Sequence, residues 1–385
     1  MQDSASEHTF LTDSFELPPQ QTRLQEFWTQ LRKNRLALMG LVIFLVFLVI
    51  ALTGRLLTFG TSLHLDPSMV RLQEKLRPPL SRPNMESLLP EEMPPMGVYL
   101  LGTDELGRDV FARMLQGAWV SLSVGFVAVG IAVFIGILLG GLAGYYGQNP
   151  IRVGEVLIAV LVIWMSLGWG KLSTLILVVL ALAAVAIAAV LVVQRDSDSR
   201  GLLHVFSAHF LSVDMVITGL IDIMLCFPSF FLILTVVALL PASIYNIMIV
   251  IGITSWMGAA RFVRAEFLSL REQDFVAAAQ ALGVPDWRII FRHMVPNAIA
   301  PVLVSATIGI AGAILTEAGL SFLGFGVPPP DATWGNILSD GKNYLFDAPW
   351  LTFIPGIAIL VVVLSFNLFG EGLRDILNPK LRERH

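Results

Sequence analysis

Long apolar runs dominate this chain and limit it to folds that a lipid bilayer can hold. The residues are 55% hydrophobic and 14% charged, whereas soluble domains carry about 25% charged residues. The hydrocarbon core offers no partners for backbone polar groups, so such runs cross it as helices. We therefore expect an all-α, polytopic membrane helical bundle in contact with lipids. The net charge of -4 gives no reason to expect nucleic acid binding.

Polar stretches separate the apolar runs, so the spans can be counted. Two runs, at 156–169 and 172–193, predict an extra hairpin inside the stretch 150–211. The first of them is short for a crossing of about 30 Å, so a re-entrant hairpin is an alternative to two full spans. The six main spans are expected at 36–53, 119–145, 213–240, 244–260, 298–320 and 351–370.

Basic residues predict the side of the membrane on which each loop lies. Arg32, Lys33 and Arg35 directly precede the first run, which places the N-terminus in the cytoplasm. An even number of spans returns the C-terminus to the same side of a cytoplasmic membrane. The expected divisions are a cytoplasmic tail with an interfacial helix at 1–35, a first span at 36–54, an extracytoplasmic loop at 55–116, a span at 117–149, the inserted hairpin with a linker at 150–211, a core at 212–370 and a cytoplasmic tail at 371–385.

A polar stretch at 271–297 interrupts the apolar core and is expected to be cytoplasmic. Residues 275–282 are rich in Ala and Leu, which favour a helix. Gly283 supplies a helix stop, because it adopts the left-handed conformation at little steric cost. Pro285 and Asp286 then favour the start of a second helix. The stretch predicts a helix, a bend and a second helix.

The second helix of this stretch is expected to be amphipathic and to end at Pro296. Arg288 and Arg292 fall outside its apolar face. A plain solvated connection between two spans is the alternative. The apolar face is expected at positions i, i+3, i+4 and i+7, which are Trp287, Ile290, Phe291 and Met294.

Two acidic residues fall within expected spans, where a charge is costly unless it faces a cavity or a partner. Asp222 precedes Pro228, which can kink its span, and Glu317 lies near the end of another. Both are candidates for a translocation pathway. A hydrogen bond between packed helices is the alternative, and we favour it for Asp222.

Motifs for catalysis are absent from the sequence. The stretch nearest to a phosphate-binding loop, at 166–173, has Leu172 where Ser or Thr is required. The six histidines are scattered without ligand spacing, and Cys226 is the single cysteine. We expect no enzyme activity, no metal and no cofactor.

Two stretches of the sequence resemble conserved segments of one family of membrane proteins. Residues 277–283, AAAQALG, together with Pro296 resemble the EAA loop of importer-type ABC permeases, although the family usually has a glutamate where this chain has Ala277. Residues 102–109, GTDELGRD, resemble the GTDxxGRD segment of peptide-type permeases. The chain resembles the second of the two permeases of dipeptide, oligopeptide and nickel importers.

This resemblance implies a type I importer-like bundle with six family spans plus the extra hairpin. It implies a second permease subunit, two ATP-binding ATPase subunits and an extracytoplasmic substrate-binding protein as partners, in the cytoplasmic membrane of a bacterium or archaeon. ATP hydrolysis then takes place on the partner ATPases. The residues that match the ATPase-coupling loop are Phe275, Ala277, Ala278, Ala279, Leu282, Gly283, Trp287, Arg288, Arg292 and Pro296.

Two other functions are considered beside an importer permease. A secondary transporter driven by an ion gradient predicts inverted repeats and paired charges within the membrane, and no repeat is evident here. A membrane scaffold that does not transport would use the stretch 150–211 to bind a partner.

Overall fold

The computed structural model describes residues 23–377 apart from 60–64, 87, 95, 148–149 and 153–208. The extra hairpin expected at 156–169 and 172–193 therefore lies outside the described residues. So do the first 22 residues and the end of the tail, from 378 onward.

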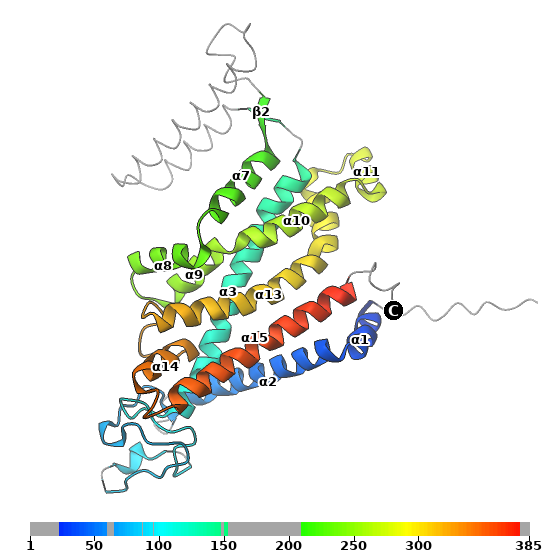
Figure 1. Ribbon diagram of the computed structural model, residues 1–385. Coiled ribbons are helices and arrows are strands. Elements are labelled where there is room, and N and C mark those ends of the chain that lie inside the picture. The colour runs from blue at the N-terminus through cyan, green and yellow to red at the C-terminus, as the bar shows by residue number, and fades with distance from the viewer. Residues whose placement is uncertain are drawn as a thin grey trace, which may run out of the picture.

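An elongated helical bundle makes up most of the described chain (Figure 1). Five stretches of the described residues are long and apolar enough to cross a membrane. Residues 65–109 lie at one end of the bundle, which we call the loop end, and the stretch 271–297 lies at the opposite end. The spanning elements are α2 (Arg35–Thr58), α3 (Val110–Tyr145), α9 (Ile244–Thr254) with α10 (Trp256–Arg271), α12 (Asp286–Arg288) continuing into α13 (Val295–Phe322), and α15 (Trp350–Leu377).

The span expected at 213–240, with a kink at Pro228, is divided into two helices. It consists of α7 (Val213–Leu225) and α8 (Ser229–Leu239), which are bent by 82° from one another. Pro228 has no backbone N–H and disfavours the helical conformation at the residue before it, so the first helix ends here. Counted as one broken span, the pair brings the described residues to six candidate spans.

Helix α3 is the central element, since α2, α7, α9, α10, α13 and α14 all pack against it. Small residues allow its closest contact, with α10. A Cβ atom on Gly144 would come within 2.4 Å of the Cβ atom of Phe267. Only glycine therefore allows the two helices to approach this closely.

The two ends of the inserted stretch lie side by side. Strand β1 (Pro150–Arg152) pairs antiparallel with β2 (His209–Ser212), with an irregularity between Ile151 and Arg152. This small sheet is an exception to the expected all-α fold. The chain thus leaves the bundle and returns to it at one place.

A folded layer covers the loop end of the bundle. It contains the short helices η2 (Leu72–Glu74), η3 (Pro90–Glu92), α14 (Trp334–Gly341) and η5 (Lys342–Tyr344). Asp109 accepts a hydrogen bond from the Phe111 amide at 2.8 Å and so begins α3 nine residues before the expected start of its span. Arg113 forms ion pairs with Asp104, at 2.6 Å, and with Asp340, at 2.9 Å.

The N-terminal helix α1 (Arg23–Lys33) packs against the end of α15. Leu31 is buried there with Ala37 and Ile376. Helix α15 continues to Leu377, so the first residues of the expected tail, 371–377, are helical.

Candidate functional site

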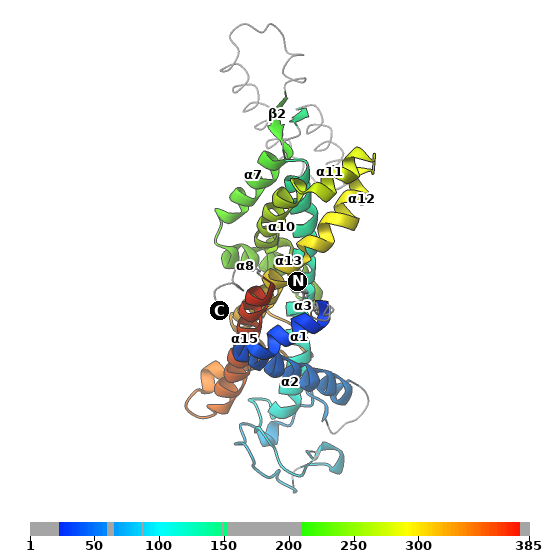
Figure 2. The same ribbon diagram turned by 90° about the vertical axis from the view of Figure 1, so that its right-hand side faces the viewer.

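The stretch 271–297 forms a helix, a bend and a second helix, as the sequence predicts. Helix α11 (Asp274–Ala281) is followed by Leu282 and then by Gly283, whose φ of 72° lies in the left-handed region. The Val284 amide donates a hydrogen bond to the carbonyl oxygen of Ala279 at 3.1 Å, which closes the bend. Figure 2 shows α11 and α12 projecting together from one side of the bundle. We call this unit the coupling segment.

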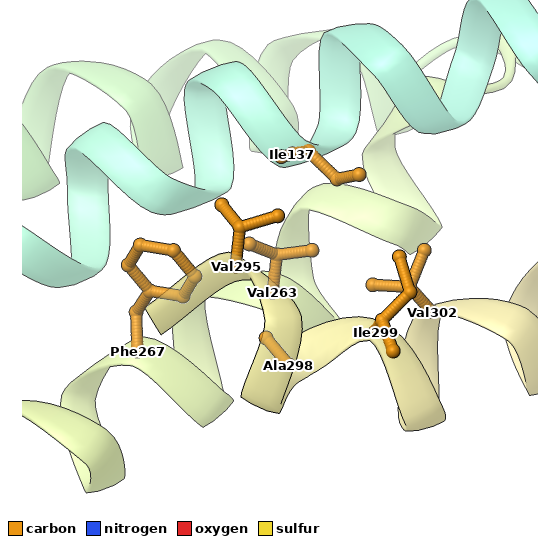
Figure 3. Close-up of a pocket in the computed structure, with 7 residues that line it drawn as sticks. All are labelled: Ile137, Val263, Phe267, Val295, Ala298, Ile299 and Val302. Carbon is orange, nitrogen blue, oxygen red and sulfur yellow. The ribbon is translucent and has the colours of Figure 1, made fainter. Parts of the chain in front are cut away.

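The inner face of the coupling segment is part of the core of the bundle. Val276, Ile289 and Met294 are buried in one cluster with Val263 of α10 and Val302 of α13. Figure 3 shows the neighbouring part of this contact, where side chains from α3, α10 and α13 meet. The segment is therefore fixed to three spanning helices and does not hang as a free loop.

The expected apolar stripe on the second helix is wrong in part. Met294 is buried, but Trp287 and Phe291 are 61% and 55% exposed. The buried pair is Ile289 and Met294, five residues apart. Residues Ile289–Met294 form a π-helix (η4), which shifts the buried positions from a spacing of 3.6 residues to one of five.

Pro296 does not end the unit. It lies in the first turn of α13, where its missing N–H is tolerated, and Asp286–Phe322 is one continuous span. At a helix interior, proline removes the hydrogen bond to the residue four before it, here Arg292. The π-helix ends at Met294, two residues before Pro296, and the Val295 amide donates a hydrogen bond to the carbonyl oxygen of Ile290. Pro296 was the one signal in the sequence for this change of phase.

The outer face of the coupling segment carries large apolar side chains that the rest of the described chain leaves uncovered. The side chain of Leu282 is 83% exposed, and that of Trp287 is also mostly exposed. The guanidinium carbon of Arg288 lies 5.3 Å from the centroid of the Trp287 ring. Ala277, Ala278 and Gly283 are exposed, whereas Ala279 is buried. Contiguous exposed apolar groups mark binding surfaces. We call the set of exposed apolar side chains the docking face; it comprises Phe275, Leu282, Trp287 and Phe291.

Two adjacent tyrosines tie the coupling segment to α3. The Tyr145 hydroxyl donates to Oδ1 of Asp286 at 2.8 Å, and the Tyr146 hydroxyl donates to Oδ2 at 3.0 Å. Arg271 donates to the carbonyl oxygen of Tyr145 at 3.0 Å. Burial, together with the hydrogen bond to Asp286, raises the pKa of Tyr146 to about 12. No pattern in the sequence predicts a role for either tyrosine at this site, and Asp286 was expected only to start a helix.

The two candidate pathway residues lie in different surroundings. Asp222 is exposed on α7 and pairs with Arg261 of α10 at 3.0 Å. Glu317 is fully buried in α13, where Ser121 and Ser321 donate hydrogen bonds to its carboxylate. The structure does not bring the two residues together. The surroundings of Glu317 favour a packing role. Within the described parts of the chain, no group of His, Cys, Asp and Glu is arranged to hold a metal.

Comparison with known proteins decides the family. Residues 202–383 match the binding-protein-dependent transport system inner membrane component, and residues 22–79 match the N-terminal membrane domain of oligopeptide transport permease C. A dipeptide transport system permease protein of Alkalihalophilus pseudofirmus is 36% identical over 93% of this chain and 90% of its own length. The chain belongs to the family of peptide-transport permeases.

Other relatives of the permease agree with this assignment. The oligopeptide transport system permease protein of Bacillus subtilis is 30% identical over 91% of this chain and 88% of its own length. The di/tripeptide transport system permease protein of Pseudomonas aeruginosa is 32% identical over 93% of each chain. Among solved structures, a chain of the MetNI methionine ABC transporter covers 67% of the permease and 95% of its own length, with a TM-score of 0.39 and 13% identity.

The family defines the general role of the chain. It is a permease subunit of an ABC importer and a multi-pass inner-membrane protein. Its relatives are transport permeases and not enzymes. An importer that depends on a binding protein has a partner permease, ATPases and a substrate-binding protein in general.

Proposed function

We propose that the docking face of the coupling segment binds an ATPase subunit and passes the movement of that subunit to the spanning helices. The observation that carries this proposal is the combination of an exposed outer face with a fully packed inner face. Leu282 and Trp287 point away from the bundle, whereas Ile289 and Met294 are buried in it. A force on the outer face therefore moves the helices behind it. A free loop would absorb that force.

Charge supports a cytoplasmic location for the coupling segment. Arg261 and Arg264 of α10 precede the segment, and Arg271, Arg288 and Arg292 lie within it. Basic residues accumulate in cytoplasmic loops. We place the loop end outside the cell and both termini in the cytoplasm. The partners proposed in full are a second, different permease, two ATPases and an extracytoplasmic binding protein.

Peptides are the proposed substrate class. The relatives carry the names of dipeptide, oligopeptide and di/tripeptide transport permeases. Their similarity extends over about nine-tenths of the chain. The permease then forms one half of a pathway for short peptides, and the ATPases supply the energy from the cytoplasmic side.

Replacement of the docking face tests the proposal. Leu282→Glu and Trp287→Glu place a charge on exposed apolar positions and leave the buried face intact. Both variants are expected to reach the membrane but to lose the ATPase subunits when the tagged permease is purified. Phe346→Glu is the matched control, because Phe346 is 96% exposed at the loop end. Normal recovery of the ATPases with both docking-face variants would refute the proposal.

A further inference from the structure

Helix α3 joins the two ends of the bundle as one continuous element. Its 36 residues extend about 54 Å at the usual rise of 1.5 Å per residue. At the loop end, Arg113 is buried between the carboxylates of Asp104 and Asp340. At the opposite end, Tyr145 and Tyr146 hold Asp286 of the coupling segment. Each end of α3 is thus fixed by directional polar contacts.

Asp286 adds two hydrogen bonds to the apolar packing between the coupling segment and α3, beside the bonds that Arg271 and Gln280 donate to Tyr145. The two tyrosine hydroxyls reach different oxygens of one carboxylate, so the carboxylate group cannot rotate without breaking a hydrogen bond. A hydrogen bond to an ionised group is stronger than one between neutral groups, and any hydrogen bond weakens as its angle departs from linear. The two rings also contact each other edge to face, with centroids 4.9 Å apart. Apolar contacts such as those of Ile289 and Met294 have no comparable directionality.

We propose that Asp286, Tyr145 and Tyr146 form a joint that makes α3 follow the coupling segment, so that movement at the cytoplasmic side reaches the loop end through α3. This inference rests on the proposed ATPase docking. The coupling segment is continuous with α10 and α13 along the chain, but it has no such covalent link to α3. The joint connects the coupling segment to α3 through hydrogen bonds instead. Asp286 and the tyrosines are positioning residues: they touch neither ATP nor peptide.

The contact network favours α3 as the element that spreads this movement. It packs against α2, α9, α10 and α13, and therefore against most of the spanning elements among the described residues. Its first turns are also fixed to the loop-end layer, where Trp334 of α14 donates a hydrogen bond from its indole nitrogen to the carbonyl oxygen of Met114 at 3.2 Å. A shift of α3 along its axis therefore moves the layer that faces the exterior.

The test removes the hydroxyls and keeps the rings. Tyr145→Phe with Tyr146→Phe retains the aromatic contact but abolishes both hydrogen bonds to Asp286. Asp286→Asn removes the charge at the other side of the joint. The complete transporter, with its second permease, ATPases and binding protein, is reconstituted in vesicles with a labelled mixture of di- and tripeptides as probe. Tyr245→Phe is the matched control, because that side chain is 71% exposed at the start of α9.

The expected result is a loss of coupling without a loss of assembly. Coupling free energies between sites correspond to factors of about 5 to 150, so peptide transported per ATP hydrolysed falls at least about fivefold in the tyrosine pair variant and in Asp286→Asn. The triple variant falls no further, since all three residues act as one joint. Recovery of the ATPases and the melting temperature remain as in the Tyr245→Phe control.

Two results would overturn the proposal. Unchanged transport per ATP in the tyrosine pair variant shows that α3 is not driven through this joint. Loss of the ATPases from that variant shows that the tyrosines only hold the shape of the coupling segment. Neither result bears on ATPase docking itself, because the Leu282→Glu and Trp287→Glu variants test that separately.

Discussion

Gly140 of α3 lies so close to α10 that a Cβ atom on it would come within 2.4 Å of the carbonyl oxygen of Ala260. The clash would involve backbone and not the end of a flexible side chain, so it cannot be relieved by a change of rotamer. The separation of α3 from α10 is therefore set by this glycine, together with Gly136 and Gly144 on the same side of the helix.

The first prediction concerns this contact. Gly140→Leu forces α3 and α10 apart and is expected to destabilise the permease by about 1–3 kcal/mol, as overpacking of a core does. Gly130→Leu is the control, because nothing lies within 4 Å of a Cβ atom built there. Thermal unfolding of the purified permease, followed by fluorescence in detergent, compares the two. Equal melting temperatures would show that the two helices separate at little cost.

The second prediction concerns the buried ion pairs at the loop end. Arg113 has a side chain only 4% exposed and contacts Asp104, which is fully buried. Arg113→Met leaves that carboxylate with one cation fewer, and the expected loss of stability is about 3 kcal/mol. Arg374→Met removes a mostly exposed pair with Asp375 and should cost less than about 1 kcal/mol. The difference between the two melting temperatures is the measurement, and no difference would contradict the buried pairing.

The third prediction concerns the bend in the coupling segment. Gly283 has a φ of 72°, and its amide donates a hydrogen bond to the carbonyl oxygen of Gln280 at 2.9 Å. Proline cannot adopt this φ, and it has no N–H with which to donate this hydrogen bond. Gly283→Pro should abolish transport while the permease still reaches the membrane. Gly283→Ala keeps the N–H and strains the backbone by about 1–3 kcal/mol, so it should retain part of the activity.

The measurement for Gly283 is peptide uptake by vesicles, normalised to the permease found in the membrane fraction. Gly258→Ala serves as the control on α10, since open space surrounds that glycine. Full uptake with Gly283→Pro would show that the bend has no part in coupling.

The fourth prediction concerns charge on the coupling segment. Arg288 and Arg292 are both exposed beside the docking face. Reversal of both to Glu should weaken recovery of the ATPases, with an effect that is largest at low salt because exposed charges are screened within about 10 Å at 0.1 M. Arg374→Glu, an exposed arginine at the end of α15, is the control. A defect that does not depend on salt concentration would argue against a direct role of these charges.

Much of the bundle follows from the sequence, because apolar runs of sufficient length permit few structures other than helices. Among the described residues, the five long apolar helices overlap the apolar runs but extend beyond the expected bounds, and the helix stop at Gly283 follows from its freedom to adopt a positive φ. The size of the bend at Pro228 does not follow, since proline ends a helix without fixing the direction of the next one.

The errors in the site have one physical source. Amphipathic patterns assume 3.6 residues per turn, and the π-helix at Ile289–Met294 breaks that assumption. Met294 is therefore buried, while Trp287 and Phe291, which were expected on the same apolar face, are exposed. The contact of Arg113 with Asp340 was beyond local reasoning as well, because the two residues are 227 positions apart along the chain. Contacts of that kind come from the packing of the whole bundle.

The pairing of β1 with β2 has a consequence for how such a chain can change over time. Because Pro150–Arg152 and His209–Ser212 lie next to one another, any segment inserted between them starts and ends at the same place on the bundle. The stretch between can be lengthened, exchanged or cut back to a tight turn without altering the route of any helix in the bundle. During evolution an insertion can therefore be gained or lost here while the packing of the spanning helices is kept.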